Sequence, residues 1–107
     1  MAGSGGVEFS NGNRAALAFP GNVGTVDFSA SGHRFGTITA NSTLVFTNPV
    51  QNRKITLEID GDFDLTFPVT ATPLSGRYIG VLGANFIFIQ CVNIVGPVYI
   101  YTIGNDL

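Results

Sequence analysis

Charge is scarce in this chain, and its scarcity argues against two classes of protein. Charged residues make up 11% of the 107 positions, with one Lys and four Arg, and the net charge is −2. So few basic residues cannot build a patch that tracks nucleic-acid phosphates, so we do not expect a nucleic-acid binder. Hydrophobic residues reach 45%, which argues against intrinsic disorder because so many apolar side chains can bury a core.

Cysteine and long apolar segments are also rare. The single cysteine, Cys91, has no second cysteine to pair with, and its apolar surroundings in the sequence predict a buried small hydrophobe. No basic and then apolar segment follows Met1, so no signal peptide is expected. The longest run without Gly or Pro has 12 residues, whereas a transmembrane helix takes about 20. We expect a protein made in a cytosol, without a membrane partner.

The abundant residues favour β-structure. Gly fills 14 positions and Pro 5, which interrupts any long helix, whereas Val, Ile and Thr together fill 29. A chain of 107 residues forms one domain. We therefore expect an all-β fold, an antiparallel β-sandwich or jelly-roll-like single domain over residues 25–107. An extended N-terminal arm is expected over residues 1–24, and no internal repeat of 20–50 residues is evident in the sequence.

The expected arm has a glycine-rich tip followed by an apolar patch, residues 15–19. Glycine-rich segments are flexible, whereas an apolar patch needs a surface to cover it. Two interpretations stay open: the arm grips a neighbouring subunit, or the patch is an edge strand of its own domain. Leu17 and Phe19 are therefore candidate partner contacts.

Alternation of apolar and polar residues predicts strands at residues 25–29, 35–39 and 43–47, with Val26 and Phe28 facing the core. Residues 55–59 and 63–69 read as a hairpin, because Asp60-Gly61-Asp62 as a three-residue loop sets apolar residues opposite one another. Pro68 and Pro73 predict a loop after this hairpin. Further strands are expected at residues 78–82, 85–92 and 98–103.

The last two expected strands are apolar on both faces. Such strands lie either between two layers of one domain or in a contact between subunits. Phe86 and Phe88 share a face of one strand, and Tyr99 and Tyr101 share a face of the next. These four aromatic residues are candidate contacts with a second subunit or another protein.

Chemical motifs are few. Asp60, Asp62 and Asp64 form an acidic string, but an EF-hand also needs Gly at position six and Glu at position twelve, where Leu65 and Ala71 stand. A looser Ca²⁺ site formed by Asp62, Asp64 and Glu58 is the alternative to a solvated turn. Glu58 and Asp64 could also form the acidic pair of a glycosidase, but no wall of a cleft is evident around them. We expect no enzyme, no catalytic residues, no cofactor and no metal.

Residues 24–104 resemble a β-domain common in bacteriophage tail fibres and related virion proteins. The resemblance covers about three quarters of the chain and consists of ordered strand and turn segments rather than a catalytic signature. The segments that carry it are Val26-Asp-Phe28, Thr37-Ile-Thr39, Ser42-Thr-Leu-Val-Phe46 with Asn48-Pro49, Asp60-Gly61, Leu65-Thr-Phe-Pro68 and Tyr99-Ile-Tyr101.

The resemblance implies a structural protein of the virion, often a homotrimer. The short length favours an accessory role, as a capsid decoration (cement) protein or a short spike or fibre component that contacts capsid or tail subunits. An alternative is a module that binds a host glycan through loop residues near His33-Arg34 and from Pro73 to Arg77. A less favoured alternative is an enzyme acting on surface polysaccharide.

Overall fold

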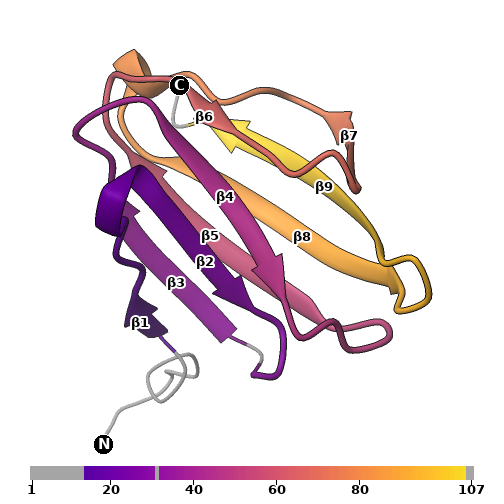
Figure 1. Ribbon diagram of the computed structural model, residues 1–107. Coiled ribbons are helices and arrows are strands. Elements are labelled where there is room, and N and C mark those ends of the chain that lie inside the picture. Colours follow the sequence, from indigo (N-terminus) through magenta and orange to yellow (C-terminus); the bar gives the residue numbers. More distant parts are fainter. Residues whose placement is uncertain (1–13, 31, 106–107) are drawn as a thin grey trace, which may run out of the picture.

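The computed structural model describes residues 14–30 and 32–105. Within this part of the chain, no helix is long and apolar enough to cross a membrane. Its regular structure consists of strands and two short 3₁₀ helices (Figure 1). The elements are β1 (Arg14–Ala16), η2 (Pro20–Asn22), β2 (Val23–Asp27), β3 (Gly32–Thr37), β4 (Ser42–Thr47), β5 (Lys54–Asp60), β6 (Leu65–Thr66), β7 (Ala71–Ser75), η3 (Gly80–Leu82), β8 (Asn85–Asn93) and β9 (Val98–Asn105).

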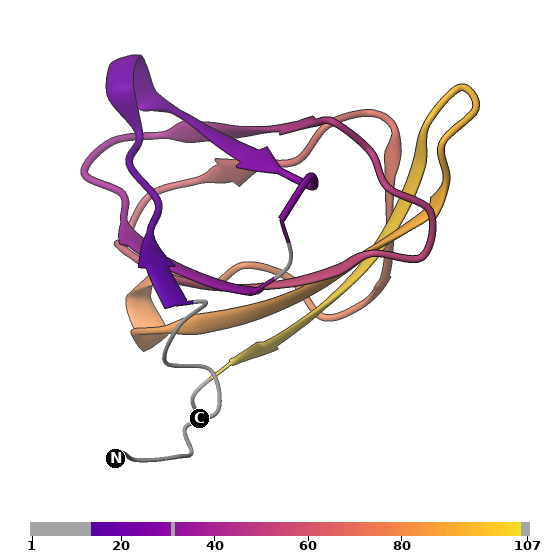
Figure 2. The ribbon, with the colours of Figure 1, turned by 90° about the horizontal axis from the view of Figure 1, so that it is seen from below.

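The first six strands follow a coil. The chain runs from β1 into β2, from β3 into β4 and from β5 into β6, and each of these pairs places one strand in each of two sheets. Equivalent strands of successive turns pair in parallel, and paired residues such as Arg14 and His33, or Ser42 and Leu65, are 19 to 23 residues apart. Figure 2 views this coil nearly end-on, as a ring of strands and turns.

The predicted all-β class is confirmed, but the predicted antiparallel arrangement is wrong for five of the seven strand pairs in the described residues. The two sheets have the orders β1-β3-β5-β8-β9-β7 and β2-β4-β6, and the path of the chain is solenoid-like. Parallel neighbours need a crossover of about a dozen residues or more. Here the strand of the opposite sheet, with a turn on each side, supplies that crossover.

The predicted hairpin over residues 55–69 is wrong. Strand β5 lies between β3 and β8, so both of its edges are already occupied, and β6 pairs with β4 in the other sheet. Asp60-Gly61-Asp62 therefore forms a corner between sheets instead of a reversal. Gly61 has a φ of 120° there, and a Cβ at this position would overlap the carbonyl of Ile38.

The strands predicted over residues 85–92 and 98–103 are confirmed as β8 and β9. They form an antiparallel hairpin, β8 pairs with β5, and β7 pairs in parallel with the outer edge of β9. The expected strand over residues 78–82 is wrong, since these residues contain η3, and the segment after Pro68 that was expected as a loop contains β7. Proline is tolerated in β7 because this strand lies at the sheet edge.

The core lies between the two sheets. Inward positions alternate with outward ones along each long strand, as the period of two requires. The rings of Phe28, Phe46 and Tyr99 meet with centroids 4.9 to 5.4 Å apart, and Phe67 stacks on Tyr101 at 4.1 Å. The buried apolar residues of the core are Leu17, Val26, Phe28, Ile38, Leu44, Ile55, Leu57, Ile59, Ile87, Ile89, Cys91, Tyr99, Tyr101 and Ile103.

A buried amide fastens the segment that leads into β8. The side chain of Asn85 is fully buried; its Oδ1 accepts the N–H of Ile79 at 2.9 Å, and its Nδ2 donates to the carbonyls of Ile79 and Gly83, both at 3.1 Å. The side chain of Asn105 also donates to Asn85 Oδ1. These bonds join the start of β8 to the end of β9, so the hairpin and the preceding segment form one rigid unit.

Candidate functional site

The predicted contact residues divide between the core and the surface. Tyr99 is 1% exposed and Tyr101 is 8% exposed, so both belong to the core of their own domain. Leu17 is buried as well, and the half-buried ring of Phe19 lies against Gly24. Residues 14–24, the second part of the predicted arm, form β1, η2 and the start of β2; residues 1–13 lie outside the described residues.

Phe86 and Phe88 point away from the core, onto the solvent side of the six-stranded sheet. We call this side the outer face and define it by the outward side chains of β5, β8 and β9 together with Leu74 of β7. Phe88 is 51% exposed and Leu74 is 59% exposed, whereas Phe86 is half-buried. The side chains of the outer face are Lys54, Thr56, Glu58, Leu74, Phe86, Phe88, Gln90, Ile100 and Thr102.

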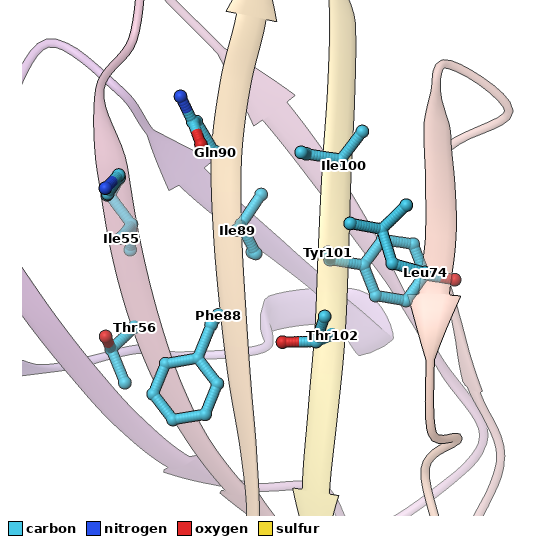
Figure 3. Close-up of a pocket in the computed structure, with 10 residues that line it drawn as sticks. Ile55, Thr56, Leu74, Phe88, Ile89, Gln90, Ile100, Tyr101 and Thr102 are labelled. Atoms are coloured by element: carbon cyan, nitrogen blue, oxygen red, sulfur yellow. The ribbon is translucent and has the colours of Figure 1, made fainter.

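A shallow groove of about 310 Å³ lies on the outer face (Figure 3). Phe88, Ile100 and Leu74 line it with apolar side chains, and Thr56 and Thr102 line it with hydroxyl and methyl groups. Lys54 is the one charged residue among the described residues that line the groove. The chemistry of the groove is that of a surface covered by another apolar surface.

Two of the strands of this face, β8 and β9, contain no charge, whereas β5 contributes Lys54 and Glu58. Residues 78–105, which include η3, β8 and β9, contain no Asp, Glu, Lys, Arg or His. Side chains at the centre of protein interfaces are depleted of charge in the same way, because burying an unpaired charge is costly. The outer face thus combines exposed aromatic and aliphatic side chains with an uncharged strand pair.

Exposed apolar side chains are concentrated in the C-terminal part of the chain. Eleven large hydrophobic residues of the described part are exposed, and seven of them lie from β7 to the start of β9. The turn between β8 and β9 projects from the body of the domain (Figure 2) and carries Ile94 and Val95. Those seven residues are Leu74, Val81, Phe88, Val92, Ile94, Val95 and Val98.

Charged groups border the outer face on one side. His33 was expected at a turn, but it lies within β3, and its Nε2 is 3.1 Å from Glu58 Oε1 on β5. The hydroxyl of Thr37 donates to Asp60 Oδ1 at 2.5 Å on the same two strands. These pairs link β3 to β5 at one side of the outer face, whereas β8 and β9 form its apolar part.

The structure does not bring the acidic string together as a metal site. In the described residues, no group of three or more His, Cys, Asp or Glu side chains is placed to hold a metal ion. Glu58 faces outward from β5, whereas Asp64 precedes β6 in the other sheet and its N–H donates to Asn41 Oδ1 at 3.0 Å. The two carboxylates considered for a glycosidase therefore lie in different sheets.

Two tyrosines and the cysteine have side chains in unusual surroundings. The hydroxyl of Tyr78 donates to the carbonyl of Gly61 at 2.7 Å, and burial together with nearby acidic groups raises its pKa to about 12. The hydroxyl of Tyr99 is buried and has no hydrogen-bond partner among the described residues. Burial also raises the pKa of the Cys91 thiol, so this thiol is a poor nucleophile.

The alternation pattern of single strands did not predict part of the exposed apolar surface. Leu74 stands in a segment with two prolines, which predicted a loop, and Ile94 and Val95 stand in a turn. The long uncharged stretch of residues 78–105 was the available signal. Comparison of the chain with family models, with curated proteins and with solved structures gave no match.

Proposed function

We propose that this chain is a structural protein of a bacteriophage virion that self-associates as a homotrimer and docks on the capsid or tail surface. In this role it is a decoration (cement) protein or a short spike or fibre component. The ordered segments between residues 24 and 104 that resemble tail-fibre β-domains support the virion setting. The outer face supports the self-association, and it is the observation on which the proposal depends.

Solvent-exposed apolar surface is costly, and it is stabilised when a partner covers it. Phe88 and Leu74 are more than half exposed, and the strands β8 and β9 of this face carry no charge. In a symmetric assembly, equivalent residues of the copies approach one another, so charges near the symmetry axis would repel. An uncharged strand pair avoids that repulsion.

The proposal is tested by placing a charge on the outer face. Phe88→Asp is suitable because the side chain is 51% exposed and contributes little to the core. Val45→Asp is the matched control, since Val45 is 39% exposed on β4 of the other sheet. Light scattering on a sizing column gives the mass of each variant, and circular dichroism verifies that both remain folded.

We expect the control to keep the mass of a trimer, near three times 11.3 kDa, and Phe88→Asp to run as a monomer. A carboxylate buried in the subunit contact costs several kcal/mol per copy, enough to dissociate a complex of micromolar affinity. If both variants retain the trimer mass, the outer face is not the contact. If both become monomers, the effect of Phe88→Asp is not specific to that face.

A further inference from the structure

A second cleft lies at the open edge of the three-stranded sheet, away from the outer face. Its volume is about 440 Å³. Residues 64–67 form one wall, Pro73 and residues 76–78 form the other, and Tyr101 and Ile103 form the floor. The floor belongs to the inner face of the six-stranded sheet, which extends further than the three-stranded sheet that covers it.

The wall at residues 64–67 is a strand edge. Among residues 14–30 and 32–105, strand β6 pairs with β4 alone. Ser42 donates its N–H to the carbonyl of Asp64 at 2.9 Å and stands in register with Leu65. In a parallel pair, the residue in register with such a donor directs its own N–H and C=O to the opposite side. The backbone groups of Leu65 therefore point into the cleft, where a further strand would pair with them.

An extended peptide is the ligand that this arrangement recognises, because unpaired backbone groups beside an apolar floor match a strand with alternating side chains. Val7-Glu8-Phe9-Ser10 has that alternation. In a strand, Val7 and Phe9 share one face and Glu8 lies on the other. Glu8 is the one acidic residue among residues 1–13. Of the two charged residues that line the cleft, Arg77 on the facing wall offers the complementary charge, and Asp64 lies at the start of the β6 wall.

The N-terminal segment of the same chain begins far from this cleft. The stretch from Ser10 to Arg14 spans at most about 14 Å when fully extended. Arg14 begins β1, which lies at the opposite end of the molecule from β6 (Figure 1), and the longest dimension of the molecule is 40 Å. A second copy of the chain has no such limit.

We infer that residues 7–10 of one copy add as an edge strand to β6 of a neighbouring copy. Val7 and Phe9 would face the floor at Tyr101 and Ile103, and Glu8 would face solvent beside Arg77. This inference rests on the proposed self-association and adds a second contact to it. The added strand would be the fourth strand of the three-stranded sheet. It would cover an edge whose unpaired backbone groups could otherwise bind any extended chain.

Disulfide trapping in the full chain tests the inference. Thr66→Cys places a thiol on the exposed side of β6. It is combined in turn with Val7→Cys, Glu8→Cys, Phe9→Cys and Ser10→Cys. Because Thr66 faces away from the core, strand addition predicts that positions 8 and 10 form disulfides with it and positions 7 and 9 do not. Non-reducing gels separate chains joined to one another from single chains, and the native Cys91 is buried.

Two controls complete the experiment. Thr66→Cys alone gives the background of β6 thiols that join to each other. Thr43→Cys has the same exposed orientation on β4, but β6 would separate it from the added strand, so no arm position should trap it. We expect at least tenfold more joined chains for positions 8 and 10 with Thr66→Cys than for positions 7 and 9 or for the Thr43→Cys set.

Equal trapping at all four positions, or trapping within single chains, would overturn the inference. The mass of the unmodified chain separates this result from the proposed function. A trimer without trapping leaves self-association through the outer face intact and removes the arm contact. A monomeric wild-type chain removes both.

Discussion

The three tyrosines provide a test of the core in which one chemical change, Tyr→Phe, has three different expected effects. The hydroxyl of Tyr99 is buried without a partner among the described residues, and Tyr99 is 1% exposed. Removing such a group deletes a desolvation cost without losing a hydrogen bond. We expect Tyr99→Phe to raise the free energy of unfolding by about 1–2 kcal/mol.

The other two positions are the controls. The hydroxyl of Tyr78 donates to the carbonyl of Gly61 at 2.7 Å, so Tyr78→Phe loses a hydrogen bond and should lower the free energy of unfolding by about 1 kcal/mol. Tyr101 is 8% exposed, and the hydroxyl of this residue is not among the buried groups without a partner. We expect Tyr101→Phe to change stability by less than about 0.5 kcal/mol.

The assay is denaturant or thermal unfolding at one fixed protein concentration, because subunit association also contributes to the apparent stability. For a domain of this size, 1 kcal/mol corresponds to about 4–8 °C in Tm. Tyr99→Phe should therefore melt above the wild type and Tyr78→Phe below it. A loss of stability in Tyr99→Phe would refute the reasoning, since it would mean that the hydroxyl contributes a favourable interaction in the core.

Further predictions concern the segment that leads into β8. Asn85→Ala should lower the free energy of unfolding by about 1–3 kcal/mol, measured by denaturant unfolding, because it removes a fully buried amide and its three hydrogen bonds to the backbone of residues 79 and 83; a loss below about 0.5 kcal/mol would contradict the described network. Gly80→Ala should cost about 1–3 kcal/mol, because its Cβ would overlap the carbonyl of Gly61, whereas Gly104→Ala, with nothing within 4 Å, is the neutral control; equal melting temperatures of the two variants would refute this. The pKa of Tyr78, raised to about 12 in the folded chain, means that the neutral phenol is favoured by folding. Its contribution to stability is complete below the unfolded pKa, about 10, and is lost as the pH rises through about 12. The difference in stability between wild type and Tyr78→Phe should therefore shrink over that range, and a constant difference would argue against the raised pKa.

Local alternation was sufficient to predict several strands and their faces. The apolar residues of 85–92 divide between two faces in the sequence, and the structure buries Ile87, Ile89 and Cys91 and directs Phe86 and Phe88 outward. The period of two fixes which residues share a face, because it depends on the strand alone. It does not say which of two apolar faces is the core.

Long-range packing decides which of the two apolar faces of a strand belongs to the core. On β9 the face with Tyr99 and Tyr101 packs against Phe46 of β4 and against Phe28 and Phe67, which directly follow β2 and β6. The tyrosines proposed as surface contacts are therefore core residues. The sequence of β9 is compatible with either face being buried. The position of the small sheet, which comes from β2, β4 and β6, settles the choice.

The parallel pairing could not be predicted from the residues around each turn. Asp60-Gly61-Asp62 is compatible with a reversal or with a corner, and the local pattern favours the reversal. The corner results because β3 and β8 occupy both edges of β5, and both partners are distant in sequence. Successive turns of the coil stack in space but form no sequence repeat. Paired residues are 19 positions apart between β1 and β3 and 23 positions apart between β3 and β5.

The mass of the wild-type chain in solution tests the central claim most directly. Light scattering on a sizing column, over a series of protein concentrations, measures it without a variant. Self-association through the outer face predicts a stable species near three times 11.3 kDa that dissociates only on dilution. A single species of 11.3 kDa at every concentration would contradict the claim, and Phe88 and Leu74 would then be exposed without a second copy to cover them.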